Sequence, residues 1–293
     1  MPDAKVVLGV QVDQAKASPF GQYMLSQVKT DDPELQKLMA ETGFDPRKNI
    51  TEVLIASTGP HDPGSNGLVL ARGSFDPARI QSAAQAHGGT VTQYSGVSVI
   101  SGNEANGDRH SIAFPDNSTA ILGDTASVQG AIGRLHGSGG LTPQLQNAVQ
   151  TASAGNDLWF VTLAPLSQIA VTVPDPSVNN AMQGSNLFQS VQQASAGVKF
   201  GDTVKVNGQA VTNSEKDAQA LVDAVRFLLG LMAMNRQKDP AAALIASLTD
   251  ALQLQATANT MSLYLAVPEK QLEALVQNMH HGAAAHHRAA PAQ

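Results

Sequence analysis

The sequence predicts an α+β fold of two related halves, each with a mixed, mainly antiparallel sheet, hairpin–helix modules and helices packed on the sheet. Two kinds of apolar spacing predict it, because short runs with a period of two, typical of strands, alternate with longer runs at helical spacing. Turn dipeptides such as Ser95-Gly96 and Asn106-Gly107 separate short neighbouring strands, which indicates an antiparallel meander. The pattern then restarts near residue 156, which divides the chain.

The first half covers residues 1–155. It opens on a strand, because Val6, Leu8 and Val10 alternate with Val7 and Gly9. Asp-Pro dipeptides mark helix starts and turns. Asp accepts hydrogen bonds from the backbone N–H groups of the first turn, and proline at the first helical position loses no hydrogen bond, because the N–H there has no partner within the helix. The expected strands are 6–12, 52–57, 67–74, 91–94, 97–101, 110–114 and 119–122, and the expected helices are 19–28, 33–42, 77–87, 125–136 and 143–153.

The second half covers residues 156–279, followed by a His- and Ala-rich tail, 280–293, that we expect to be disordered. Ser214 with Asp217 fits a capping box at the start of a long helix. The expected strands are 158–163, a hairpin of 197–200 with 203–207, and a hairpin of 254–257 with 261–267. The expected helices are 186–193, 216–235, 241–252 and 268–279, with a short helix or turn at 165–171.

Two segments suggest an internal repeat. His110 to Leu135 is predicted as a hairpin with an Asp-Asn turn followed by a capped helix, and Gln253 to Asn278 as a hairpin with an Ala-Asn turn followed by a proline-initiated helix. We therefore expect two diverged repeats around a pseudo-twofold axis. The alternative is that such units recur in any α+β chain.

Charge is scarce. Asp, Glu, Lys and Arg make up 14% of the 293 residues, with a formal net charge of -6, against about 25% in an average soluble domain. No Lys/Arg block could follow a phosphate backbone, so we expect no nucleic-acid partner. The absence of cysteine excludes disulfides and thiolate metal sites. No apolar run approaches the ~18 residues of a membrane span.

Motifs that carry chemistry are weak. The histidines of the folded part (His61, His87, His110 and His136) lack metalloprotease spacing, and the four in the tail could hold a transition metal only weakly. Ser26-Gln27-Val28-Lys29 matches S-x-x-K without its companion motifs. Acids near strand ends each adjoin a turn or cap signal: Asp13, Glu52, Asp116, Asp124, Asp157 and Asp202. We therefore assign no catalytic, cofactor-binding or metal-ligating residue and expect no cofactor.

The long helix 216–235 has more apolar surface than one face can bury. Leu221, Val225, Leu228 and Met232 share one face. We expect the helix to lie buried between the two halves, with the alternative that it leaves an apolar interface for a partner or ligand. That interface would comprise Phe227, Leu229, Leu231 and Met234.

Several segments resemble a group of uncharacterised, predicted exported bacterial proteins, a domain of unknown function. They are Pro2–Asp13, Ser18–Gln22, Thr42–Arg47, Arg72–Pro77 and Leu122–Val128, and they cover most of the first half and little of the second. The resemblance implies a cleavable leader before the first strand, and hence a periplasmic or secreted location, but no known activity or site residues. Because the chain enters a strand by Val6, we expect either that the protein is cytoplasmic or that a leader has been removed from it.

We therefore expect a non-enzymatic exported protein that acts in binding or envelope-associated scaffolding. Its partner would be an unknown protein or a small apolar ligand, and it would be a monomer or homodimer without a membrane span. The alternatives are a hydrolase with a site in the inter-half cleft and a carrier of apolar ligands. The small pool of acids and bases free for proton transfer favours binding.

Overall fold

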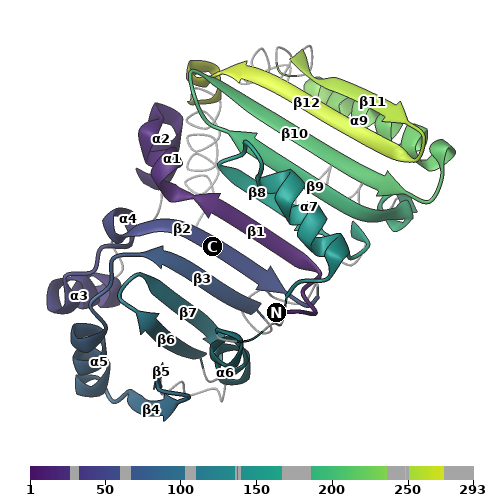
Figure 1. Cartoon of the computed structure of the whole chain (residues 1–293). Helices are drawn as coiled ribbons and strands as arrows, with labels where there is room; N and C mark the ends of the chain where they lie inside the picture. Colours follow the sequence, from purple (N-terminus) through teal and green to yellow (C-terminus); the bar gives the residue numbers. More distant parts are fainter. Residues whose placement is uncertain are drawn as a thin grey trace, which may run out of the picture.

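The structure is a computed structural model that describes residues 1–26, 33–59, 67–102, 110–135, 137, 140–166, 186–235, 248 and 251–273. Among these, the side chains of 33–35, 186–187 and 231–235 are not described. Within the described chain, twelve strands form one sheet in the order β11-β12-β10-β9-β8-β1-β2-β3-β7-β6-β5-β4 (Figure 1). All neighbouring strands run antiparallel. The predicted α+β class and mainly antiparallel pairing are confirmed.

The elements alternate along the chain much as the apolar periods predict. The strands are β1 (Val6–Gln11), β2 (Ile50–Ser57), β3 (Gly67–Gly73), β4 (Thr90–Tyr94), β5 (Val97–Ser101), β6 (His110–Asp116), β7 (Thr119–Asp124), β8 (Leu158–Thr162), β9 (Val191–Lys199), β10 (Thr203–Thr212), β11 (Gln253–Thr257) and β12 (Thr260–Pro268). The helices are α1 (Val12–Ala17), α2 (Pro19–Ser26), α3 (Pro33–Thr42), α4 (Pro46–Asn49), α5 (Pro77–Ala86), α6 (Thr125–Arg134), α7 (Pro143–Ser153) and α9 (Glu215–Asn235), with a 3₁₀ turn η2 (Asn186–Ser190).

The two predicted halves share this sheet. β1 from residues 1–155 and β8 from residues 156–279 pair in the middle, with Leu8 opposite Phe160. Outward from this junction, each side continues with two strands of a meander and then a hairpin, β7–β6 on one side and β12–β11 on the other. The described residues therefore join the halves edge to edge, within one layer.

Helices cover both faces of the sheet. We call the face that carries α6 and α7 the near face, since it is turned toward the viewer in Figure 1, and the opposite face, which carries α5 and α9, the far face. Neighbouring residues of a strand point to opposite faces. Accordingly, Ile121 packs with Val128 of α6, whereas Ala120 packs with Ile80 of α5.

The long helix α9 does not lie between the halves. Its buried residues Leu221 and Val222 pack on Ala210 and Met261 of the far face, and its neighbours are β10, β11, β12 and η2, all from the second half. Phe227 is 63% exposed. The expectation of a helix buried between two halves is therefore wrong for the described residues, because the halves meet through strand pairing.

Local chemistry explains most element boundaries. Asp45 and Asp76 cap α4 and α5 by accepting from backbone N–H groups of their first turns, with proline at the first helical position in each.

The expected helix over 186–193 is wrong beyond Ser190, because Val191 enters β9 and pairs with Thr212. Long-range pairing overrides the local helical spacing there. The hairpin strands predicted at 197–200 and 203–207 are longer, for the same reason.

Parts of the C-terminal expectations lie outside the described residues. Residues 269–273 are helical, as expected after Pro268, but the rest of that helix, most of the helix expected at 241–252 and the tail 280–293 are not described. The buried Glu269 accepts a hydrogen bond from the backbone N–H of Phe20. This contact joins the start of the last helix to α2.

Candidate functional site

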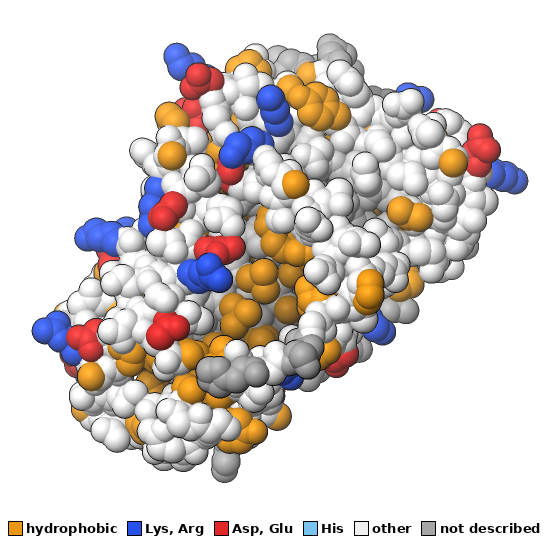
Figure 2. Space-filling view, in the orientation of Figure 1, with side chains coloured by type: hydrophobic (Ala, Val, Ile, Leu, Met, Phe, Trp, Pro, Cys, Tyr) orange, Lys and Arg blue, Asp and Glu red, His pale blue; other side chains and the backbone are white. Residues whose placement is uncertain are grey.

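A short strip of the near face lies uncovered between α7 and α6, over β2 and β3. It is limited on one side by Gly9 of β1, which is buried under Trp159. It is limited at one end by a buried row, Val7, Ala56 and Leu68, where Met1 packs against the clusters of both helices. Figure 2 shows hydrophobic side chains gathered in a hollow at this place. Leu54 of β2 packs against the α7 cluster and Leu70 of β3 against the α6 cluster, and both remain partly exposed. We call this strip, floored by Leu54 and Leu70, the central groove.

Strand register explains why the floor is apolar. Gly9, Leu54, Leu70 and Ile121 stand side by side across β1, β2, β3 and β7. The next near-face row, two residues along each strand, is also apolar or small. At Leu54 and Leu70 the floor thus continues the core beneath α6 without a described helix above it.

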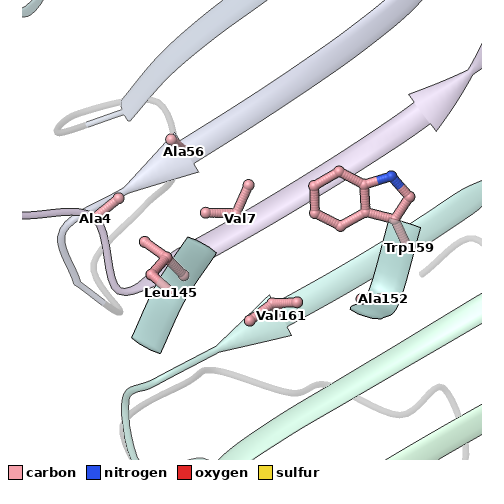
Figure 3. Packing of buried hydrophobic residues seen from close by; sticks show 7 residues of the cluster. All are labelled: Ala4, Val7, Ala56, Leu145, Ala152, Trp159 and Val161. Carbon is pink, nitrogen blue, oxygen red and sulfur yellow. The ribbon is translucent and has the colours of Figure 1, made fainter. Parts of the chain in front are cut away.

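Trp159 of β8 forms the boundary of the groove on the α7 side (Figure 3). Its indole lies over Gly9, and a Cβ atom at Gly9 would overlap the ring. Leu145 of α7 packs with Val7 near the start of β1. The glycine therefore lets a large aromatic ring settle against the neighbouring strand.

One end of the groove is polar. Gln11 Nε2 donates to Glu52 Oε1 at 2.8 Å, and Arg72 Nε lies 3.8 Å from Glu52 Oε2. The Glu52 side chain is 33% exposed and that of Arg72 is 75% exposed. Because Arg72 keeps most of its guanidinium in solvent, it can receive an anionic group from a ligand that lies on the floor.

The same polar row continues beyond β1 under α7. Asp157, whose side chain is 4% exposed, accepts from Lys199 Nζ at 2.6 Å and from the backbone N–H of Phe200 at 2.8 Å. Nearby, Asn207 Nδ2 donates to Asn156 Oδ1 at 2.8 Å. These buried polar groups satisfy one another, as buried polar groups must, so we assign them a structural role at the β8–β9–β10 junction.

The other acids predicted near strand ends also serve structure. Hydrogen bonds from Ser118 hold the pKa of Asp116 below its usual value in the β6–β7 turn. Desolvation alone would raise the pKa of Asp124, but the hydrogen bonds at the start of α6, chiefly from Ser127, outweigh it and lower the pKa. Asp13 pairs with Lys16 at 3.2 Å, and the carbonyl of Asp202 accepts from the N–H of Glu269. Only Glu52 lies in the groove.

The histidine and serine candidates that the structure describes, His87, His110 and Ser26, do not converge on the groove. His87 Nε2 lies 2.9 Å from Glu41 Oε2 on the surface, beside a shallow hollow between α3 and α5. His110 is exposed at the start of β6, and Ser26 donates to the carbonyl of Tyr23. His61, His136, Lys29 and the tail histidines lie outside the described residues.

The apolar interface predicted on the long helix is only partly described. Phe227 is exposed and Leu229 is half-buried, while Leu231 and Met234 lie in the stretch of α9 whose side chains are not described.

The central groove was not predicted from the sequence. One sequence pattern could have indicated it. Glu52 and Leu54, and likewise Leu70 and Arg72, are two residues apart on predicted strands, so on each strand one face combines an apolar residue with a charge, and the two charges are opposite.

The described residues hold neither a cluster suited to a metal ion nor a helix suited to cross a membrane. They contain no group of three or more His, Asp or Glu side chains placed to hold a metal ion. Within the same residues, no helix combines the length and apolarity required to cross a bilayer. The chain matches no protein-family model, no curated protein and no solved structure.

Proposed function

We propose that the protein is a non-enzymatic binding protein whose central groove holds an apolar surface of a partner. One observation carries the proposal: the near face stays apolar at Leu54 and Leu70 where no described helix covers it. Exposed apolar patches of this kind on a folded protein are typical of interaction sites. Arg72 and Glu52 at one end would orient what binds.

The hydrolase alternative finds little support at this site. In the groove, the carboxylate of Glu52 is engaged by Gln11 and Arg72. A general base has to be free to accept a proton from its substrate. Because β1 and β8 are paired directly, the described residues provide no inter-half cleft in which Asp, His and Ser could meet. A carrier of small apolar ligands would use the same floor.

We also infer that the two halves are diverged copies of one unit, related by a pseudo-twofold axis between Leu8 and Phe160. Matching register shifts and backbone hydrogen bonds in the two halves support this. β2–β3 and β9–β10 each shift register at corresponding ends, beside the Ile50–Gly73 and Val191–Thr212 pairs. Corresponding backbone bonds flank these shifts: Ser74 to Asn49 and Asn213 to Ser190, and Gly73 to Ser118 and Thr212 to Asn259.

The junction has the same symmetry. The N–H of Gln11 donates to the carbonyl of Asp157 at 2.6 Å, and the N–H of Leu163 donates to the carbonyl of Lys5 at 2.7 Å. A twofold axis exchanges these two bonds. Such pairing at both ends of β1 and β8 is what two copies of one strand make when they meet antiparallel.

Export remains part of the proposal, supported by the resemblance of the N-terminal segments. Fractionation of the natural host with an antibody to the protein tests it. Recovery from the periplasm or medium is expected, and recovery only from the cytoplasm would contradict export without affecting the groove.

A hydrophobic dye tests the groove. We expect 1-anilinonaphthalene-8-sulfonate, which has an apolar body and an anionic group, to fluoresce when it binds the native protein. The double variant Leu54→Gln/Leu70→Gln should reduce that fluorescence at least several-fold. Phe227→Gln, on the far face, is the matched control, since it removes an exposed apolar side chain elsewhere. Urea unfolding checks that each variant is folded. An unchanged signal in the folded groove variant would overturn the proposal, as would an equal loss in the control.

A further inference from the structure

We infer that the protein forms a homodimer in which the β11 strands of two copies pair antiparallel and continue the sheet across a twofold axis at Gln255. The α9 helices of the two copies then lie side by side on the far face. Three features of the described residues support this: an uncharged edge strand, a hollow beside it, and a stripe on α9 that is complementary to itself. Because this surface is separate from the central groove, the inference is independent of the proposed function.

β11 is the last strand at one end of the sheet (Figure 1). Its closing pair with β12, Thr257 and Thr260, flanks a two-residue turn and is therefore a hydrogen-bonded pair. Because such pairs alternate along antiparallel strands, the N–H and C=O groups of Leu254 and Ala256 point away from β12. Edge strands are usually protected by charged residues, prolines or bulges, and residues 253–257 contain none of these. β11 is therefore suited to pair with a further strand.

The first half of the chain shows a strand in the corresponding place. The hairpin β6–β7 lies as far from the β1–β8 junction as β11–β12 does, and it is followed outward by β5. Ile100 of β5 pairs with Ile112 of β6, and both contribute to the core beneath α5. Within the described part of the chain, no strand takes this place beside β11. The strand framework can thus extend by one more strand at this edge.

A hollow lies beside β11 on the far face, between this strand and α9. It is lined by Ala256 of β11 and by exposed side chains of α9. Antiparallel pairing about Gln255 sets Leu254 of the second copy opposite Ala256, on the far-face side where both residues pack in each chain. Leu254 of each copy then enters the hollow of the other. Facing apolar residues of this kind stabilise a strand pair.

The stripe of α9 at this hollow is complementary to itself in charge. Lys216, Gln219, Ala220 and Asp223 are exposed and follow one another at helical spacing. α9 runs along β11 (Figure 1), so a twofold axis there brings two such helices together antiparallel. Lys216 of each copy then lies beside Asp223 of the other, with the small Ala220 near the crossing.

The carboxylate of Asp223 is open to such a contact. Within its own chain it accepts from Gln219 Nε2 at 3.1 Å and lies 3.9 Å from Arg226 Nη1, and its side chain is still 62% exposed. Two charge pairs related by the axis steer one copy toward the other and set the register. A second copy is therefore favoured at this edge over an unrelated strand.

A charge placed on the axis tests the strand pairing. Gln255 is exposed, so Gln255→Glu should leave the fold intact, but it sets two carboxylates opposite each other and should weaken dimerisation at least 10-fold. Sedimentation velocity of the full chain across a dilution series measures the dissociation constant of the dimer. An equimolar mixture of Gln255→Glu and Gln255→Lys should dimerise at least as tightly as the native chain. Gln93→Glu, the same change on the exposed β4 at the opposite end of the sheet, is the control and should have no effect.

A charge exchange tests the helices. Lys216→Glu and Asp223→Lys should each weaken the dimer about 10-fold, because each turns two attractions into repulsions. The double variant reverses both members of each pair and should restore the dissociation constant of the native chain, which a loss of helix stability would not do. Lys37→Glu, at an exposed position of α3, is the matched control. Circular dichroism and urea unfolding check that each variant is folded.

Four results would overturn the inference. The native chain could stay monomeric at its highest soluble concentration, or Gln255→Glu could leave the dimer unchanged. Gln93→Glu could weaken the dimer as much as Gln255→Glu does, or the double charge exchange could fail to restore it. If the chain stays monomeric and binds a synthetic peptide with the sequence of β5, the edge takes an extended segment of another protein and the homodimer is wrong.

Discussion

The near face of the sheet differs sharply between the two halves. In the first half, Leu68, Ile121 and Val99 present an apolar surface that α6 covers. In the second half, the strands beyond β9 present Gln209, Ser262 and other amide or hydroxyl side chains at the same face. Gln209 pairs with Ser262, and the row ends at the exposed Gln255 of β11.

The strand framework is nevertheless the same on both sides of the junction. Hairpins β6–β7 and β11–β12 both turn through two residues, between Asp116 and Thr119 and between Thr257 and Thr260. Backbone pairing is indifferent to which side chains a strand carries, whereas burial depends on them. A common framework can therefore hold a covered core in one half, an open polar surface in the other, and a groove where they meet.

The largest expected effect separates covered from open positions. Ile121→Ala, at a residue 1% exposed under α6, should lower the free energy of unfolding by about 3 kcal/mol, because it leaves a cavity. Ser262→Ala, at the corresponding near-face position of β12, should change it by less than ~0.5 kcal/mol. Urea unfolding measures both. Equal effects would break the distinction between the two halves.

A smaller effect is expected where the halves join. Gly9→Ala should cost about 2 kcal/mol, because a methyl group there overlaps the Trp159 indole and forces repacking between β1 and β8. Gly208→Ala in β10 is the control, since its Cβ would lie 3.6 Å from the nearest atom and the change should be neutral or stabilising by about 0.5 kcal/mol. Thermal unfolding compares the two. A harmless Gly9→Ala would show that the junction is loosely packed.

The smallest effect concerns the helix caps and pH. Asp124 caps α6, and Ser214 caps α9 with a hydroxyl that does not titrate. Asp124→Ala and Ser214→Ala should each cost about 1 kcal/mol at neutral pH. Because the folded state lowers the pKa of Asp124, its contribution is complete above the unfolded pKa of about 3.9 and is lost as the pH falls through the folded value.

Unfolding midpoints in urea between pH 7 and pH 2.5 measure this difference. The gap between the protein and Asp124→Ala should shrink below about pH 4, while the gap for Ser214→Ala should persist. A pH-independent gap for Asp124→Ala would show that the carboxylate stabilises α6 no more than its protonated form does.

Sequence reasoning succeeded where neighbouring residues decide the structure. The Asp-Asn turn after β6, the caps at Asp45 and Asp76 and the start of the long helix at Ser214 follow from local hydrogen bonding. The short helix α1 escaped prediction because Val12 reads as the end of the preceding strand. The 186–193 helix failed because pairing with a distant strand decided the outcome.

The candidate site was less predictable for the same physical reason. Gln11, Glu52 and Arg72 are far apart along the chain and meet only because β1, β2 and β3 pair in one register. The groove depends further on where α6 and α7 end up on the sheet. By contrast, Phe227 could be predicted as an exposed apolar residue, because a surplus of apolar residues in one helix can be counted in the sequence without knowing how that helix packs.

The pairing of β1 with β8 has a consequence for synthesis of the chain. β1 finds its first partner, β2, early, but Val6 pairs on its other side with Thr162, far along the chain. At 5–20 residues per second, translation takes roughly 8–30 s to reach β8. During that interval the uncharged outer edge of β1 is open to any extended chain nearby. The middle of the mature sheet is thus its most vulnerable edge while the protein is being made.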